Sequence, residues 1–98
     1  MTRAEVIEKL KANRPAIENY GATALYLYGS HARDEAKPDS DIDIFFDRDL
    51  SKKFGLLQLA GLKHMLEDLF ETEVDVTTRT SLHPRLKQDI EISAIRVF

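Results

Sequence analysis

Two aspartates placed two residues apart are the first residues of this chain that could do chemistry. Asp41 and Asp43 alternate with apolar residues in a segment that reads as a β-strand, so both carboxylates face the same way. Like charges at that distance repel one another, and one pKa should rise unless a cation lies between them. Hard oxygen ligands of this kind suit Mg²⁺ or Mn²⁺. The pair therefore predicts a site for a divalent metal ion.

A third aspartate repeats this pattern farther along the chain. Asp75 lies in the apolar segment 73–78, which also reads as a strand. A neighbouring strand could bring its carboxylate beside the first pair. Three carboxylates can hold two metal ions about 3.5–4 Å apart, the arrangement used for in-line phosphoryl or nucleotidyl transfer. We therefore expect Asp41, Asp43 and Asp75 to be both catalytic residues and metal ligands.

A glycine and a serine stand where a strand should end and a short helix begin. Gly29 permits close approach of the backbone, and the Ser30 hydroxyl and the free amides of the helix start can hold a phosphate. Arg33 would lie about one turn farther on and could reach the same anion. Each motif alone is weak, because Asp-x-Asp pairs are usually solvated. Their order along the chain predicts a metal-dependent site in which Gly29, Ser30 and Arg33 bind a nucleotide.

A small α/β fold should position these side chains. Strands interleaved with helices indicate one sheet covered by helices, and we expect a mixed sheet of about three strands. The expected strands are 22–28, 41–46 and 73–78. The expected helices run from a capping box at Thr2 to near Asn13, from Pro15 to Gly21, for one or two turns within 31–36, over 54–70, and from Pro84 onward. The tail 95–98 could be helical or extended.

Composition excludes several classes of protein. The chain has 98 residues, no Cys and a net charge of −3. The absence of Cys rules out a disulfide scaffold and a thiol nucleophile and suits the cytoplasm. The negative charge argues against non-specific nucleic-acid binding, and no apolar run approaches the roughly 18 residues of a membrane span. We expect a single domain over 1–98, with no membrane contact and little room for a separate acceptor-binding half.

The spacing of these motifs resembles a known signature. Gly29-Ser30, ten further residues and Asp41-Ile42-Asp43 resemble the polymerase-beta-like nucleotidyltransferase superfamily, and the string GSHAR…SDIDIFF is similar to its minimal (MNT) branch. The resemblance runs from residue 20 to residue 78 and implies that superfamily's fold. In that family two aspartates and a later third bind Mg²⁺, and Gly-Ser holds the triphosphate. By resemblance these roles fall on Asp41, Asp43, Asp75, Gly29 and Ser30.

Residues around the Gly-Ser turn carry further expectations. Arg33 matches a position that is commonly basic in the family. The next residue is often Gly in relatives but is Asp34 here, which would add negative charge near the phosphate path. We expect His31 to lie at the surface, with nucleotide contact as the alternative. Tyr26 and Tyr28 are expected in the core or in a half-buried strand, with base stacking as the alternative.

The resemblance also implies a reaction and a partner. It implies a Mg²⁺-dependent enzyme, with two ions and with Mn²⁺ as a substitute, that transfers AMP from ATP to a hydroxyl of a protein. MNT proteins are often antitoxins paired with HEPN-type toxins, so a HEPN-type toxin is the expected acceptor, in a homo- or hetero-oligomer. Two alternatives stay open. The chain could be a non-catalytic binding module that neutralises its partner by contact, or a nucleotidyltransferase for small molecules.

The predicted helix 54–70 carries apolar residues on more than one side. Its main stripe should face the core, whereas Leu56 and Leu57 fall outside the stripe. Either a partner chain covers these two leucines or the preceding loop folds over them, and both interpretations stay open.

Overall fold

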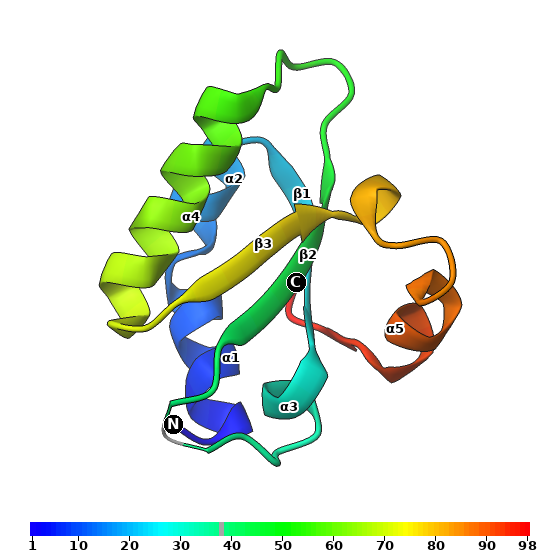
Figure 1. Cartoon of the computed structure of the whole chain (residues 1–98). Helices are drawn as coiled ribbons and strands as arrows, with labels where there is room; N and C mark the ends of the chain where they lie inside the picture. The colour runs from blue at the N-terminus through cyan, green and yellow to red at the C-terminus, as the bar shows by residue number, and fades with distance from the viewer. Residues whose placement is uncertain (38) are drawn as a thin grey trace.

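The computed structural model of the chain describes residues 1–37 and 39–98. Its centre is a mixed sheet in the order β3-β2-β1-β4 (Figure 1). The strands are β1 (Ala22–Tyr28), β2 (Ile42–Arg48), β3 (Val74–Thr78) and β4 (Ile95–Arg96). Strand β1 runs antiparallel to both β2 and β4, and β2 runs parallel to β3. The prediction of a mixed sheet is confirmed, and the sheet gains a fourth strand from the tail that the sequence left open.

Strand β2 is shifted relative to its predicted range of 41–46. It begins one residue later because β1 ends at Tyr28, whose partner is Asp43, so β1 has no residue left to pair with Asp41. It also continues two residues farther, since Asp47 and Arg48 pair with the start of β1. Asp41 therefore lies immediately before the strand rather than on it.

Three helices cover one face of the sheet (Figure 1). They are α1 (Arg3–Ala12), α2 (Arg14–Asn19) and α4 (Leu56–Phe70). The predicted capping box is present, because the Thr2 hydroxyl accepts from the Glu5 N–H while the Glu5 carboxylate accepts from the Thr2 N–H. The core lies between these helices and the sheet and is formed by side chains from both. Its residues include Val6, Leu10, Ile17, Leu62 and Leu66 of the helices and Leu25, Leu27, Ile42, Ile44 and Val74 of the strands.

The remaining helices are short and lie next to strand ends in the sequence. They are α3 (Gly29–Ala32) after β1, a 3₁₀ turn η1 (Arg79–Ser81) after β3, and α5 (Lys87–Ser93) before β4. The loop before α4 does not cover the leucines at the start of that helix, because Leu56 is 84% exposed and Leu57 is 86% exposed. No helix in the described part of the chain is both long and apolar enough to cross a membrane.

The second face of the sheet carries polar and aromatic side chains. Residues of β2 alternate between the two faces, so the burial of Ile44 against the helices turns Asp43 and Phe45 to the second face. Phe45 stacks on Tyr26 with ring centroids 4.8 Å apart, and Tyr28 tilts against it at 5.7 Å. Both tyrosines are half-buried, which is one of the two positions that the sequence left open. This face therefore combines an aromatic centre with acidic residues.

Candidate active site

Two of the predicted aspartates lie side by side on adjacent strands. Asp43 of β2 is the register partner of Asp75 on β3, and on its other side it pairs with Tyr28 of β1. Neighbouring strands lie about 4.8 Å apart, which brings the two carboxylates into one row. Asp43 is half-buried and Asp75 is exposed. The parallel pairing of β2 with β3, which the sequence did not specify, creates this row.

The Gly29 backbone lies directly against the Asp43 carboxylate. Gly29 has a φ of +73°, in the left-handed region that favours glycine. A Cβ added at this position would clash with the Oδ2 atom of Asp43 and lie 3.1 Å from its Cγ. Only glycine can therefore begin α3 here while Asp43 keeps its place. The Gly29 turn therefore lies directly beside the row formed by Asp43 and Asp75.

Burial and like charges disturb the ionisation of this row. Burial, together with the nearby Asp75 and Asp41, raises the pKa of Asp43 to about 6, with Arg33 opposing the rise. Burial, followed by the charges of Asp43 and Asp75, likewise raises the pKa of Tyr28 to about 12. The site is an electronegative cluster that a cation would stabilise.

The predicted metal ligands have the oxygen atoms that a hard cation prefers, but their side chains are not arranged around a common point. Asp41, Asp43 and Asp75 supply only carboxylate oxygens, the ligands that Mg²⁺ and Mn²⁺ prefer. Within residues 1–37 and 39–98, however, no three His, Cys, Asp or Glu side chains come together closely enough to hold a metal ion. Side-chain rotation would have to bring the three carboxylates around an ion.

The predicted nucleotide-binding residues follow the glycine turn. Ser30 lies half-buried in the first turn of α3, and its carbonyl accepts a hydrogen bond from the Glu35 N–H at 2.9 Å. Arg33 is exposed, with its Nε 3.2 Å from the Glu35 carboxylate. Arg33 is close enough to oppose the rise in the Asp43 pKa. An incoming phosphate would compete with Glu35 for this guanidinium.

The Asp34 side chain is turned toward the N-terminus of α1. The residue adopts a φ of +57°, in the left-handed region that favours glycine. Its Oδ1 accepts a hydrogen bond from the Arg3 N–H at 3.0 Å, at the N-terminus of α1. A negative charge is favourable there because the free N–H groups of a helix start point outward. The Asp34 carboxylate therefore links the start of α1 to the segment that follows α3.

His31 contradicts the expectation of a surface residue. Its side chain is buried, with 5% of its surface exposed, and its Nδ1 lies 3.0 Å from the Asp41 carbonyl oxygen. The ring turns inward because α3 follows β1 directly and packs against the chain entering β2.

Helix α4 fixes the edge strand that carries Asp75. Strand β3 lies at the edge of the sheet, so its outer backbone groups lack a partner strand. Lys63 donates from Nζ to the Val74 carbonyl at 2.6 Å, and the Glu67 carboxylate accepts from the Val74 N–H at 3.2 Å. The start of β3, one residue before Asp75, is thus held by β2 on one side and by α4 on the other.

Arg79 forms a cluster that the sequence analysis did not anticipate. Its guanidinium pairs with both carboxylate oxygens of Asp47, at 2.7 and 3.1 Å, and also with Glu91 of α5. It lies over the rings of Tyr26 and Phe45 at 4.7 and 5.0 Å. Opposite charges one position beyond the last β2–β3 pair were the signal that could have revealed it.

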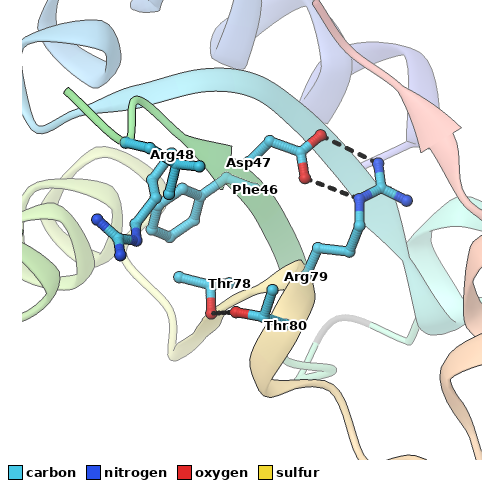
Figure 2. A pocket seen from close by; sticks show the side chains of 7 residues that line it. Phe46, Asp47, Arg48, Thr78, Arg79 and Thr80 are labelled. Atoms are coloured by element: carbon cyan, nitrogen blue, oxygen red, sulfur yellow. Dashed lines mark hydrogen bonds and ion pairs between the residues drawn. The ribbon is translucent and has the colours of Figure 1, made fainter.

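A cavity of about 320 Å³ borders this Arg79 cluster. Figure 2 shows Asp47 and Arg79 paired with one another in its lining, with the hydroxyl groups of Thr78 and Thr80 also lining it. The cavity lies at the end of β2 opposite to Asp43, so it is separate from the row of carboxylates.

The comparisons with known proteins agree with this geometry. The family model described as "Nucleotidyltransferase domain" matches residues 4–97. A relative from Methanocaldococcus jannaschii named "Putative protein adenylyltransferase MJ0126" is 36% identical over 98 residues, covering 98% of each chain. A solved structure described as a "putative minimal nucleotidyltransferase" is 34% identical, with a TM-score of 0.75 over 97% of this chain and 95% of that one.

A more distant match supports the fold alone. The structure described as "tri-AMPylated Shewanella oneidensis HEPN toxin in complex with MNT antitoxin" matches with a TM-score of 0.66 and 16% identity. The match covers 94% of this chain and 71% of that one.

Proposed function

The chain belongs to the nucleotidyltransferase domain family, in its minimal branch, and we propose on that premise that it transfers AMP from ATP to a hydroxyl of a protein acceptor. The observation that carries this proposal is the Asp43 carboxylate, held between the Gly29 backbone and Asp75. Because the Methanocaldococcus jannaschii relative is named a putative protein adenylyltransferase, AMP is the proposed group that is transferred.

The Gly29-Ser30 turn would bind the triphosphate. Its backbone approaches the Asp43 carboxylate closely, so a phosphate bound at the turn lies beside the acidic row. The Ser30 hydroxyl can donate to a phosphate oxygen. Arg33 would exchange its pairing with Glu35 for the phosphate, since a guanidinium binds a phosphate in a bidentate manner. These three residues would orient the nucleotide for attack.

The aspartates would hold the divalent cation and receive a proton. Asp41, Asp43 and Asp75 would ligate Mg²⁺ or Mn²⁺, which stabilises the negative charge that develops on the phosphoryl oxygens. Asp75 is exposed and therefore open to an acceptor hydroxyl, whose proton it would take. The acceptor oxygen then forms a bond to the α-phosphorus while the bond to pyrophosphate breaks. Pyrophosphate leaves with the electron pair of that bond.

A HEPN-type toxin is the proposed acceptor, which makes this chain an antitoxin. The support is the similar fold of the MNT antitoxin that was solved with an AMPylated HEPN toxin. The exposed Leu56 and Leu57 favour a protein partner in addition, because apolar side chains at a surface often mark an interface. They would serve equally well if the chain neutralised its partner by contact alone.

Transfer of label tests the proposed function. The chain is incubated with a HEPN-type protein from the same organism, with labelled ATP and with Mg²⁺, and the label on that protein is located by mass spectrometry. We expect AMP on a side-chain hydroxyl of the partner, with no transfer when Mg²⁺ is removed by a chelator. Label absent from the partner, together with a stable complex, would instead favour neutralisation by contact.

A further inference from the structure

One buried titratable side chain takes no part in the proposed reaction. Among the described residues, His31 is the one polar or charged residue that is buried. It lies in α3, two residues after Gly29 and one after Ser30. A buried polar side chain requires a hydrogen-bond partner, and the identity of that partner indicates what the side chain does.

The partner of His31 is a backbone group of the acidic segment. Nδ1 of the ring lies 3.0 Å from the Asp41 carbonyl oxygen. Because a carbonyl oxygen only accepts, Nδ1 must carry the proton and donate it. The N–H on the other side of the same peptide group, that of Ile42, donates to the Glu73 carbonyl at 3.1 Å. The Asp41–Ile42 peptide group is therefore held at both ends.

These two hydrogen bonds connect three separate segments. The His31 bond ties the peptide group to α3, which begins with the phosphate-binding turn. The Glu73 bond ties it to the segment entering β3, which carries Asp75 two residues later. Asp41 itself precedes the peptide group and Asp43 follows it. One peptide group thus joins the three segments that carry the residues proposed for the site.

The His31 bond also replaces a bond that the sheet cannot supply. Strand β1 ends at Tyr28, opposite Asp43, so no strand residue of β1 lies beside Asp41. Without His31, the carbonyl of Asp41 would lose the partner that fixes the direction of this residue at the start of β2. Catalytic carboxylates tolerate little misplacement, because an error of about 1 Å can cost a hundredfold in rate.

We propose that His31 is a positioning residue, whose Nδ1–H holds the Asp41 carbonyl and so aligns Asp41 with the Gly29-Ser30 turn. The proposal rests on the proposed function for its effect on catalysis. Its structural part stands on the hydrogen bond itself. The competing possibility is that Nε2 of the same ring contacts the nucleotide. In the part of the chain that the structure describes, no protein partner of Nε2 is found.

Three substitutions separate the two ring nitrogens. His31→Asn places an amide N–H near the position of Nδ1, His31→Gln places one near Nε2, and His31→Leu removes both while retaining apolar bulk. We expect His31→Asn to keep kcat within about threefold of the wild type. His31→Leu and His31→Gln should each lose about tenfold or more in kcat, with the KM for ATP changed by less than about threefold.

Two measurements decide the structural part without relying on activity. Hydrogen exchange of the Ile42 N–H should be slow in the wild type and in His31→Asn and faster in His31→Leu and His31→Gln, each shown by thermal melting to be folded. Long-range ¹H–¹⁵N correlation on the wild-type protein should show the Nδ1–H tautomer of His31. The second measurement needs no variant, so it holds even if His31→Asn does not fold.

Several results would overturn the positioning role. Rescue by His31→Gln but not by His31→Asn would assign the function to Nε2, and an Nε2–H tautomer would remove the hydrogen bond to Asp41. Unchanged kcat and unchanged Ile42 exchange in His31→Leu would show that the bond is dispensable. A wild-type protein that transfers no AMP but shows the expected tautomer and exchange would overturn the proposed function and leave the positioning of Asp41 intact.

Discussion

Asp43 is the residue on which the candidate site depends. It touches the Gly29 backbone, pairs in register with Asp75, and has a pKa raised to about 6 by burial and by its acidic neighbours. A charged carboxylate in such surroundings costs stability, and no contact of the core requires it. Its presence therefore points to a function.

Replacement of Asp43 by asparagine should separate catalysis from binding. Asp43→Asn retains the shape of the side chain but removes a negative charge and a proposed metal ligand. We expect transfer of AMP to fall by about a hundredfold or more, equivalent to about 2.7 kcal/mol of barrier. Complex formation with the partner, measured by calorimetry, should be nearly unchanged. Full protection of cells by the variant would contradict a catalytic role in neutralisation.

The raised pKa of Asp43 predicts how stability depends on pH without metal. The folded state holds the proton more tightly than the unfolded state, whose pKa is near the ordinary value of 3.8. The stabilisation is therefore fully present below about pH 4 and is lost as the pH rises through about 6. Its size is at most about 1 kcal/mol, since solvent screens a half-exposed group.

Thermal melting in a chelator from pH 4 to pH 7 measures this effect. Asp43→Asn should remove the pH-dependent loss, so the variant should be more stable than the wild type at pH 7 and similar to it at pH 4. Asp68→Asn, at an exposed position on α4, is the matched control and should leave the wild-type profile unchanged. A wild-type profile retained by Asp43→Asn would assign the loss to another group.

At the scale of elements, the contacts between strands and helices hold the site in place. Strand β3 is an edge strand, yet Lys63 and Glu67 of α4 bind both backbone groups of Val74. At the other end of the sheet, Arg79 links β2 to α5 through Asp47 and Glu91. The second face of the sheet is thereby bounded by elements that are distant in the sequence.

Removal of the Arg79 guanidinium should loosen α5. Arg79→Met retains the apolar stem over Tyr26 and Phe45 but leaves Asp47 and Glu91 without their shared cation. We expect a loss of about 1–3 kcal/mol in the free energy of unfolding, measured by urea titration. Arg85→Met, at an exposed position, serves as the control and should cost less than about 0.5 kcal/mol. Equal losses in the two variants would refute the linking role of Arg79.

The start of α4 allows a further prediction about surface and core. Leu57 is 86% exposed, so Leu57→Glu should change the free energy of unfolding by less than about 0.5 kcal/mol. Leu66, fully buried on the same helix, should lose about 2–5 kcal/mol as Leu66→Ala. If Leu57 contacts the partner, Leu57→Glu should weaken the complex measured by calorimetry. A variant that unfolds would place Leu57 in the core instead.

At the scale of the whole molecule, ligand binding should stabilise the fold. The chain carries a net charge of −3, and part of the negative charge gathers in one row on the second face. Mn²⁺ together with ATP should raise the melting temperature, because a ligand present at 100 times its Kd adds about 2.7 kcal/mol of stability. Asp43→Asn should show little of this rise. An unchanged melting temperature of the wild type with both ligands would argue against the site.

The sequence by itself determined the local elements and the order of the motifs. The strand 22–28, the capping box at Thr2 and the inward stripe of helix 54–70 depend on residues only a few positions apart, so periodicity and capping chemistry reveal them. The spacing from Gly29-Ser30 to Asp43 likewise belongs to the chain. These features predicted the residues of the candidate site and its family before any tertiary contact was known.

Only the tertiary structure decided which of these features meet. The register of Asp43 with Asp75, the burial of His31 against Asp41, the joining of the tail to β1 as β4 and the pairing of Arg79 with Asp47 all link residues ten or more positions apart. Side-chain pattern specifies which face of a strand is buried, but not which strand lies beside it. Those neighbours depend on how the apolar faces of all the elements pack together into one core.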